Sequence, residues 1–421
     1  MTSPDPDIVE FGRKAETLIQ ALADCSEEPT RLIRKFLSPE HRRAADLVQA
    51  WMSDAGMTVT QDALATLRGH YNPSNASKLV LCGSHIDTVI DAGRYDGNFG
   101  VVAGILAVDE IRRRGIDLPF GLEILAFGDE EGVRFPTTLG SSSAIAGLVN
   151  DEVLSLVDDD GISMRQALME FGADPSAFRN IVYRPEDLLA YLEVHIEQGP
   201  VLEAQGYPVG VVTSIAGHAR HMITVKGVAG HAGTVPMTLR RDALTAASKI
   251  ILDIEQLARD NQAHAMVATI GRLELLPGAS NVIPNEVTFS VDLRAASDAP
   301  RIAATAEIER ICAQIEANRG VQVTLAQDHA GDTTACSEPI QDHIAGAISD
   351  IGLTPFRLPS GAGHDGQSLA KITDIGMIFV RCRDGISHNP AEHASMDDMG
   401  YAVAALVGTL ERMGRHYSAS S

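Results

Sequence analysis

Short apolar runs that end in polar or charged residues recur along the chain. Four of them read KLVLCGSH, LEILAFGDEEG, AYLEVHIEQG and MIFVRCRDGISH, and they begin at residues 78, 122, 190 and 377. Continuous apolar runs without alternation are typical of strands buried on both faces. The pattern therefore predicts an α/β sheet that is covered by helices.

The segment between the first two runs, NFGVVAGILAVDEIRRRG (residues 98–115), has its apolar residues on one helical stripe and a glycine after its basic end. These features are typical of a helix with its own stop signal. The order strand, helix, strand predicts a parallel sheet, in which ligands bind beyond the carboxyl ends of the strands. His and acidic residues stand at that end of all four runs.

Two other stretches have patterns of their own. Residues 27–61 are predicted to be helical, because Leu32, Ile33 and Phe36 recur near helical spacing. Between about residues 216 and 328 the pattern predicts strands at 221–230, 266–276, 285–295 and 321–329, and helices at 240–259 and 300–320. This β-α-β-β-α-β order is typical of a ferredoxin-like layer. We expect a smaller domain, residues 217–329, inserted into a larger one made of residues 1–216 and 330–421.

Length and composition agree with a two-domain globular protein. The chain has 421 residues, of which 45% are hydrophobic and 21% are charged. A single core rarely grows beyond about 300 residues, so this length favours two domains. The 34 basic and 56 acidic residues give a net charge of −22. This charge repels phosphate backbones and anionic lipid surfaces, so neither nucleic acid nor a membrane is an expected partner.

Cysteine usage and the N-terminus indicate the compartment. The five cysteines are scattered and include no C-x-x-C pair, which favours reduced, mostly buried thiols. The first residues, MTSPDPDIVE, carry acids where a secretory signal would need a basic start and an apolar run. No stretch approaches the roughly 18 apolar residues of a membrane span. The expected compartment is the cytoplasm.

The first apolar run and the loop after it offer three candidate residues. In GSHIDTV, His85 and Asp87 are two apart at a strand end, so Asp87 can hold one imidazole nitrogen while the other binds a metal. Asp96 follows in the glycine-rich loop DAGRYDGNFG, beside Gly97 and close to Gly100. Glycine permits close backbone approach, and a carboxylate can bridge two cations. Taken alone, each motif is better explained by a surface His beside a capping Asp or by a plain acidic turn.

The other three runs add further candidates. GDEEG supplies Glu130 and Glu131, two like charges that cost stability unless something positive lies nearby. EVHIEQG supplies His195 with Glu197 and Gln198, and the last run ends at His388. Three His, a central Asp and a Glu at neighbouring strand ends form the mixed nitrogen and oxygen set that suits Zn²⁺ or Mn²⁺.

These motifs resemble the ureido-hydrolysing branch of the dinuclear metallopeptidase superfamily, which also holds aminoacylases and glutamate carboxypeptidases. The resemblance extends over nearly the whole chain from about residue 80 onward, in the motifs GSHIDTV, RYDGNFG, FGDEEGVRF, EVHIEQGPVLE, GHAGTVPM, PGASNVIP, LPSGAGHD and GISHNPAE. It implies an aminopeptidase-like catalytic domain with a mixed, mainly parallel sheet. It also implies that the inserted ferredoxin-like domain serves as lid and dimerisation domain, with hinges near Gly217 and Ala330.

The resemblance implies two divalent metal ions per subunit, Mn²⁺ by the habit of the family or Zn²⁺. One ion would be bound by His85, Asp96 and His195, and the other by Asp96, Glu131 and His388. Asp96 would bridge the two ions, and Glu130 would be the general base. His195 is the discriminating ligand, because the peptidase relatives generally place a carboxylate there.

The inserted domain and one loop would supply the substrate contacts. His231 of GHAGTVPM would stabilise the developing oxyanion, and in this family it tends to reach the active site of the neighbouring subunit, which implies a homodimer. Asn281 and Arg294 would bind the substrate carboxylate, since an Arg fork matches that group. Gln198 would be a second contact.

Within the branch, the motifs are most similar to those of allantoate amidohydrolase, which converts allantoate to ureidoglycine, ammonia and carbon dioxide in purine catabolism. N-carbamoyl-L-amino acid hydrolase and β-ureidopropionase are alternatives, because their substrates also pair a ureido group with a carboxylate. A dipeptidase or aminoacylase of the same superfamily is a further alternative. The segment GHARHM, with His218, Arg220 and His221, departs from the family pattern and leaves the substrate open.

Overall fold

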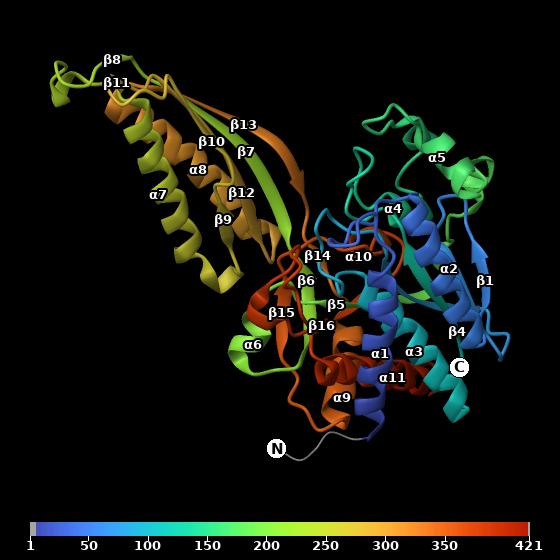
Figure 1. Ribbon diagram of the computed structural model, residues 1–421. Coiled ribbons are helices and arrows are strands. Elements are labelled where there is room, and N and C mark those ends of the chain that lie inside the picture. The colour runs from blue at the N-terminus through green and yellow to red at the C-terminus, as the bar shows by residue number, and fades with distance from the viewer. Residues whose placement is uncertain (1–5, 420–421) are drawn as a thin grey trace. The chain divides into compact units, whose positions relative to one another are not determined.

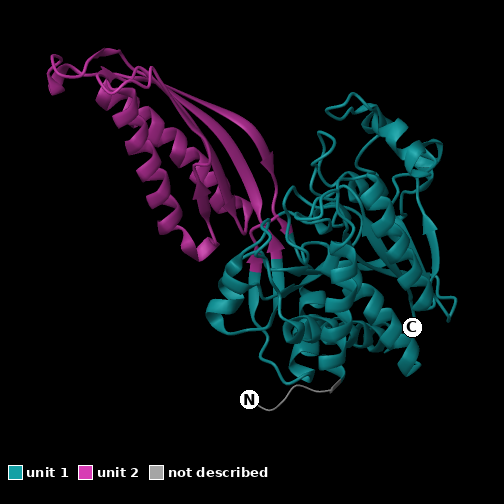
Figure 2. Cartoon of the chain, in the orientation of Figure 1, with its two compact units in different colours: residues 1–213, 335–358, 363–421 teal, residues 214–334, 359–362 magenta. Residues whose placement is uncertain are grey.

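The computed structural model describes residues 6–419 and divides into two compact units (Figure 2). The first consists of residues 1–213, 335–358 and 363–421, and the second of residues 214–334 and 359–362. The first five residues of the expected segment 1–216 and the last two of 330–421 lie outside the described residues. Each unit has a sheet and helices of its own.

The first unit is built on a nine-stranded sheet of order β1-β2-β4-β3-β5-β16-β6-β14, with β15 paired to β6 (Figure 1). Its four central strands, β4, β3, β5 and β16, run parallel and are the strands predicted from the apolar runs. The strands are β1 (Thr58–Gln61), β2 (Leu67–Tyr71), β3 (Leu79–His85), β4 (Gly121–Phe127), β5 (Leu188–Ile196), β6 (Val209–Ile215), β14 (Thr334–Ala335), β15 (Arg357–Ser360) and β16 (Ile375–Val380). The mixed, mainly parallel sheet expected from the sequence is confirmed.

Helices cover this sheet. Helix α3 packs on β3, β4 and β5, α9 and α11 pack on β16, and α1 packs on α3 and α11. The helices of this unit are α1 (Pro6–Ala23), α2 (Pro39–Asp54), α3 (Asn98–Arg114), α4 (Gly140–Ile145), α5 (Met164–Phe171), α6 (Val201–Gln205), α9 (Glu338–Asp350), α10 (Gly366–Leu369) and α11 (Met396–Ala419). Helix α3 ends at Gly115 in the left-handed conformation, as its stop signal predicted.

The prediction of helix across residues 27–61 is wrong for its first and last parts. Only α2 is helical there, and residues 58–61 form β1. Glu28 precedes Pro29, and a residue before proline is driven away from helical conformation. Leu37 has a positive φ of 59°, and Ser38 caps α2 by accepting a hydrogen bond from the His41 backbone. The apolar side chains of this segment pack without helical geometry.

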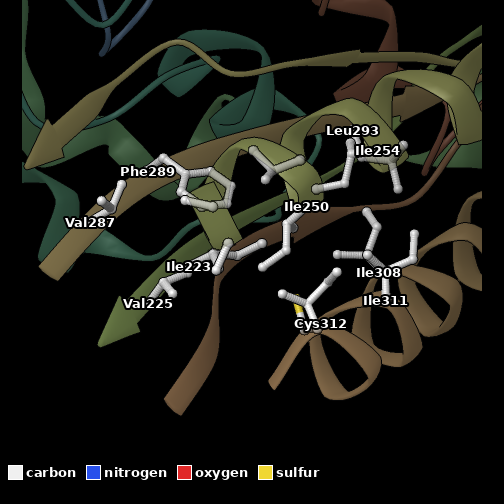
Figure 3. Close-up of a cluster of buried hydrophobic side chains, with 14 of the residues drawn as sticks. Ile223, Val225, Ile250, Ile254, Val287, Phe289, Leu293, Ile308, Ile311 and Cys312 are labelled. Atoms are coloured by element: carbon white, nitrogen blue, oxygen red, sulfur yellow. The ribbon is translucent and has the colours of Figure 1, made fainter. Parts of the chain in front are cut away.

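The second unit has an antiparallel sheet of order β10-β12-β7-β13, with β9 paired to β12. Its elements are β7 (Gly217–Lys226), β8 (Gly230–His231), α7 (Ala243–Asp260), β9 (Val267–Thr269), β10 (Leu273–Leu276), β11 (Val282–Ile283), β12 (Glu286–Ala295), α8 (Asp298–Arg319) and β13 (Gln322–Gly331). Strand β12 alternates strictly between buried and half-buried residues, so one face of the sheet is covered. Ile250 of α7, Phe289 of β12 and Ile308 of α8 meet in the core on that face (Figure 3).

The prediction of reduced, mostly buried cysteines agrees with the structure. All five cysteines are buried, and none forms a disulfide. Among residues 6–419, no helix combines the length and the apolar character that crossing a bilayer requires.

Candidate metal centre

Four of the five predicted metal ligands, together with Glu130, stand at or after the carboxyl ends of the four parallel strands. His85 is the last residue of β3 and His195 is the penultimate residue of β5. Glu130 and Glu131 follow β4, and His388 follows β16. Because β4, β3, β5 and β16 are adjacent, their carboxyl ends meet at one edge of the sheet.

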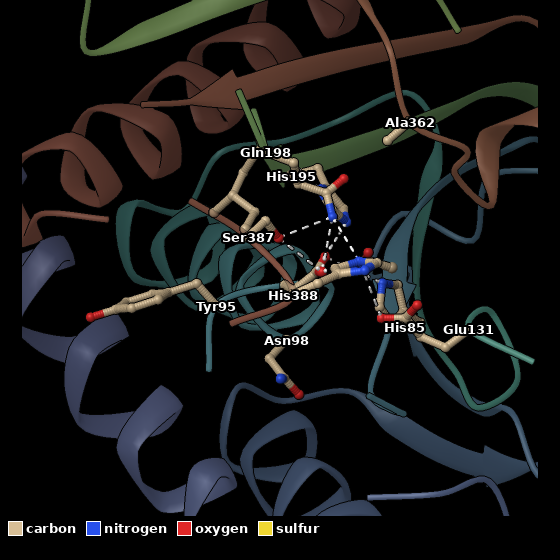
Figure 4. A network of polar contacts seen from close by, with 12 residues as sticks. His85, Tyr95, Asn98, Glu131, His195, Gln198, Ala362, Ser387 and His388 are labelled. Atoms are coloured by element: carbon tan, nitrogen blue, oxygen red, sulfur yellow. Dashed lines mark hydrogen bonds and ion pairs between the residues drawn. The ribbon is translucent and has the colours of Figure 1, made fainter. Parts of the chain in front are cut away.

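Asp96 lies at the centre of this group, and its two oxygens face different partners. Figure 4 shows the side chains of His85, His195 and His388 close together. Its Oδ1 lies 3.2 Å from Nε2 of His195 and 3.8 Å from Nε2 of His85. Its Oδ2 lies 3.2 Å from Nε2 of His388, which is in turn 3.9 Å from Oε1 of Glu131. The carboxylate thus lies between two sets of possible ligands.

The donor atoms fit a pair of cations. Those of His85, Asp96 and His195 lie within 4.8 Å of one another, and so do those of Asp96, Glu131 and His388. Oδ1 of Asp96 is buried and accepts no hydrogen bond from the described residues. A buried carboxylate oxygen without a donor is costly, and a cation between it and the two imidazoles would remove that cost.

Asp87 does more than face the imidazole of His85. Nδ1 of His85 lies 3.0 Å from the Asp87 backbone carbonyl and 3.5 Å from its carboxylate. The two carboxylate oxygens accept hydrogen bonds from the backbone N–H groups of Glu130 and Glu131, at 3.2 and 3.1 Å. Asp87 therefore ties the turn after β3 to the loop after β4, and it fixes the backbone that carries both glutamates.

The backbone of the site is unusual at three positions. Gly97 has a φ of +64°, and a Cβ there would lie 2.4 Å from the His85 ring, so only glycine fits. Gln198 and His388 also have positive φ values, 55° and 52°. Non-glycine residues are rarely held in this region unless their surroundings fix them. Here both side chains contact Asp96.

The two polar residues after His195 have different surroundings. Nε2 of Gln198 donates to Oδ2 of Asp96 at 2.9 Å, so this predicted substrate contact also belongs to the centre itself. Glu197 accepts hydrogen bonds from the backbone of Val201 and Leu202, and caps the short helix α6. Its proximity to His195 in the sequence thus reflects a structural role.

Glu392 is a site residue that sequence reasoning missed. Its Oε1 accepts hydrogen bonds from the backbone N–H groups of Tyr95 and Asp96, at 2.9 and 3.1 Å. Its Oε2 accepts from Ser387, which also contacts Asp96. Glu392 therefore holds the loop that presents the central carboxylate. Its place four residues after His388, in the motif GISHNPAE, is the signal that could have found it.

Burial and neighbouring charges shift the pKa values of the ionisable groups at this centre. Burial raises the pKa of Glu130 well above its ordinary value, and the neighbouring Glu131 adds to the rise. Burial also raises the pKa of Glu131 to about 7. The hydrogen bond to Asp96 raises the pKa of His388 to about 9. The centre therefore favours added positive charge, as two neighbouring glutamates predicted.

A second layer of buried groups lies behind the histidines. The ring of His364 packs edge-on against His195 with centroids 4.4 Å apart. Glu193 accepts hydrogen bonds from Oγ of Ser84 and from the backbone of Gly366, and burial raises its pKa to about 8. These contacts fix the orientation of β5 and of the imidazole it carries.

The predicted substrate contacts of the second unit do not come together. His231 and Asn281 are neighbours, because Val282 pairs with His231 and the Ala232 backbone donates to Asn281. Arg294 lies at the opposite end of β12, where its guanidinium contacts Asp292 and the Gly361 carbonyl. The eight residue steps from the start of β12 at Glu286 to Arg294 span about 27 Å of extended strand. One small molecule cannot contact both ends.

The segment that departs from the family pattern lies on β7. His218 lies across from Arg294, and its Nε2 is 2.8 Å from Nδ1 of His329 on β13. Arg220 forms an ion pair with Asp292. His221 points to the covered face of the sheet and is buried, and neither of its ring nitrogens has a hydrogen-bond partner among the described residues.

Comparison with known proteins places this geometry in context. Residues 81–412 match the family described as peptidase family M20/M25/M40. Allantoate deiminase from Arabidopsis thaliana is 39% identical, over 94% of this chain and 82% of that protein. N-carbamoyl-L-amino acid amidohydrolase from Geobacillus stearothermophilus is 38% identical, over 86% of this chain and 88% of that protein. The crystal structure of an amidase of the hydantoinase/carbamoylase family from Burkholderia multivorans matches with a TM-score of 0.89 at 32% identity, over 95% of this chain and 97% of that one.

Proposed function

The chain belongs to peptidase family M20/M25/M40 and is a hydrolase of carbon–nitrogen bonds, and on that premise we propose that it cleaves the ureido group of allantoate. The observation that carries the proposal is the position of Asp96, whose two oxygens face two separate ligand sets. That arrangement is suited to a bridging carboxylate between two cations.

His85, Asp96 and His195 would hold one cation, and Asp96, Glu131 and His388 the other. A pair of divalent ions polarises a carbonyl and lowers the pKa of water towards neutrality. Mn²⁺ and Zn²⁺ both accept this mixed set of imidazole and carboxylate donors. The protein supplies the fixed geometry through Asp87, Gln198 and Glu392.

Glu130 is the proposed general base. It stands next to Glu131, and its backbone is held by Asp87. It takes the proton of the attacking water and then delivers that proton to the leaving nitrogen of the substrate. Positive charge from the cations would bring the pKa of its carboxyl, which burial raises, back towards the range of a base.

The substrate carboxylate and the developing oxyanion need groups from the second unit. Arg294 would bind the carboxylate, and His231 would donate a hydrogen bond to the oxyanion. Because His231 pairs with β11, ahead of the start of β12, and Arg294 lies near the end of β12, they would act on one substrate only if they came from two copies of the chain. A homodimer in which each copy lends His231 and Asn281 to the other satisfies this geometry.

Allantoate and N-carbamoyl-L-amino acids are the two substrate classes to separate. Relatives named for each are nearly equally similar to this chain, at 39% and 38% identity. Both substrates carry a ureido group beside a carboxylate, so the same contacts serve both. We place allantoate first, because its named relative covers more of this chain.

The test is ammonia release by Mn²⁺-reconstituted protein from allantoate, ureidoglycolate, N-carbamoyl-β-alanine and N-carbamoyl-L-amino acids. We expect the highest kcat/KM on allantoate. A higher value on an N-carbamoyl amino acid would make that the substrate. Faster cleavage of a dipeptide, measured by the release of free amino acids because this reaction forms no ammonia, would overturn the proposal. Glu130→Gln protein, reconstituted in the same way, is the control for contaminating activity.

A further inference from the structure

Arg34 is a fully buried cation in the segment between α1 and α2. Its exposed fraction is 0%. Its guanidinium donates to three backbone carbonyls and one side-chain amide, and no carboxylate among residues 6–419 accepts a hydrogen bond from it. Arginine is almost never fully buried unless it is paired. Such a residue is expensive to keep for stability alone.

Every arm of the guanidinium has an acceptor. Nε donates to the carbonyl of Ile86 at 2.6 Å, and Nη2 donates to Oδ1 of Asn98 at 2.5 Å. Nη1 donates to the carbonyls of Leu22 and Cys25, at 2.5 and 3.1 Å. Arg34 thereby joins the end of α1 to two loops of the first unit.

The first of these loops carries His85 and Asp87. Ile86 is the residue between them, and both of its backbone polar groups form hydrogen bonds. Its N–H donates to the carbonyl of Phe127 at 2.8 Å, and its own carbonyl accepts from Arg34. These two hydrogen bonds hold the backbone between His85 and Asp87 in place.

The second loop presents Asp96. Asn98 lies two residues further on, at the start of α3, with its amide directed away from the histidines (Figure 4). Its Nδ2 donates to the carbonyl of Arg94, which closes the loop around Asp96. Its Oδ1 is held by Arg34. The guanidinium of Arg34 is therefore hydrogen-bonded to the loop two residues after Asp96.

Backbone hydrogen bonds of residues 32–34 add to the contacts of the Arg34 side chain. The N–H of Arg34 donates to Oγ1 of Thr88 at 2.9 Å, and the N–H of Thr88 donates to the carbonyl of Arg34 at 3.0 Å. The N–H of Ala92 donates to the carbonyl of Leu32. Residues 32–34 thus lie along the loop that connects His85 to Asp96.

The free-energy cost of burying the Arg34 guanidinium favours a role in positioning the residues around it. Burial lowers the pKa of Arg34 to about 10, so the guanidinium stays charged at neutral pH. Desolvating a charge is costly, and the acceptors that offset this cost for Arg34 are neutral carbonyls and one amide. Lysine could not replace Arg34, because a single ammonium cannot reach acceptors that lie in several directions.

We propose that Arg34 is a positioning residue of the metal centre, which fixes the His85 turn and the Asp96 loop relative to each other. It touches neither metal nor substrate and acts through the Ile86 peptide and the Asn98 amide. The proposal deepens the proposed two-metal function and rests on it. Outer partners of metal ligands typically change metal affinity about 10- to 100-fold when they are lost.

The test compares Arg34→Lys and Asn98→Ala with the wild-type protein. Metal-free protein is titrated with Mn²⁺ by calorimetry, the absorption spectrum of the Co²⁺-loaded form is recorded, and unfolding in urea is followed. We expect Arg34→Lys to weaken Mn²⁺ binding about 10- to 100-fold and to alter the Co²⁺ spectrum. Of the hydrogen bonds that Arg34 donates, Asn98→Ala removes only the one to the Asn98 amide. We therefore expect smaller changes in Mn²⁺ affinity and in the Co²⁺ spectrum, in the same direction as for Arg34→Lys.

Arg301→Met is the matched control. Arg301 is also buried, at 4% exposure, but it pairs with Asp298 and Asp332 in the second unit. Its loss should lower stability in urea and leave Mn²⁺ affinity and the Co²⁺ spectrum unchanged.

Three outcomes decide the proposal. Weaker Mn²⁺ binding by both test variants, with the control unchanged, supports it. Wild-type affinity and spectrum in Asn98→Ala, or in a folded Arg34→Lys, would overturn it. If the wild-type protein itself takes up no Mn²⁺, the proposed metal centre fails first and this proposal with it.

Discussion

At the scale of single residues, Glu130 and Glu131 are neighbours with different proposed tasks. Glu131 faces His388 and the second ligand set, whereas Glu130 belongs to neither of the two sets that share Asp96. Glu130→Gln keeps the size of the side chain and removes its ability to take a proton. We expect two bound metal ions per chain and a loss in kcat of at least about 10²-fold. Elemental analysis and initial rates on one sample check both. Unchanged kcat at full metal content would remove Glu130 from the mechanism.

Glu392 should contribute both to the stability of the fold and to metal binding, although it is not a proposed ligand. Glu392→Ala leaves the buried N–H groups of Tyr95 and Asp96 without their acceptor. Each such loss costs about 1 to 3 kcal/mol. We expect urea unfolding at lower concentration and weaker metal binding. Glu197→Ala, which removes the cap of α6 instead, should destabilise without changing metal affinity.

The residues found from the sequence differ in kind from those missed. The proposed ligands His85, Glu131, His195 and His388 stand at or near the end of an apolar run, and Asp96 follows in a glycine-rich loop. Their residue types are those that metal ions favour. Arg34 and Glu392 are common residue types whose roles depend on backbone groups far away in the chain. Only the folded loops show which carbonyl or N–H they meet.

At the scale of elements, a buried ion pair links β2 to β4. Oε1 of Glu123 on β4 accepts hydrogen bonds from Arg68 on β2 and from Tyr183, both at 2.7 Å. Burial opposes the charge, but His70, Arg68 and Tyr183 together lower the pKa of Glu123 to about 2 from its usual 4.5. A lowered carboxyl pKa stabilises the fold above about pH 4.5, and that stability is lost as the pH falls towards 2.

This ion pair yields a prediction on acid stability. At about 1.4 kcal/mol per pKa unit, Glu123 contributes about 3 kcal/mol at neutral pH. The free energy of unfolding should fall between pH 4.5 and 2 more steeply in the wild type than in Glu123→Gln. Urea unfolding of both proteins across that range measures the difference. Parallel curves would mean that Glu123 is not held ionised.

Helices and strands could be predicted from the sequence where a single local pattern determines their backbone conformation. The four parallel strands and α3 follow from uninterrupted apolar runs and a glycine stop. The helix prediction failed for residues 27–38. Leu32, Ile33 and Phe36 mimic helical spacing, but Pro29 and the turn at Leu37 determine the backbone. Their packing against distant parts of the chain is a tertiary effect that periodicity does not report.

At the scale of the whole molecule, the separation of His231 from Arg294 makes a prediction about assembly. If each site takes His231 from one copy and Arg294 from the other, the variants His231→Ala and Arg294→Ala should each be nearly inactive. Random mixing of the two would leave half of the dimers with one intact site, so activity should return to about a quarter of wild type. Activity after subunit exchange measures this. No recovery in proven mixed dimers would place both residues in one chain's site or in none.

The central claim concerns two cations on either side of Asp96, and anomalous diffraction from a crystal grown with Mn²⁺ tests it most directly. We predict two peaks about 3.5 to 4 Å apart. One should lie among His85, Asp96 and His195, and the other among Asp96, Glu131 and His388. A single peak, or manganese bound away from Asp96, would contradict the claim.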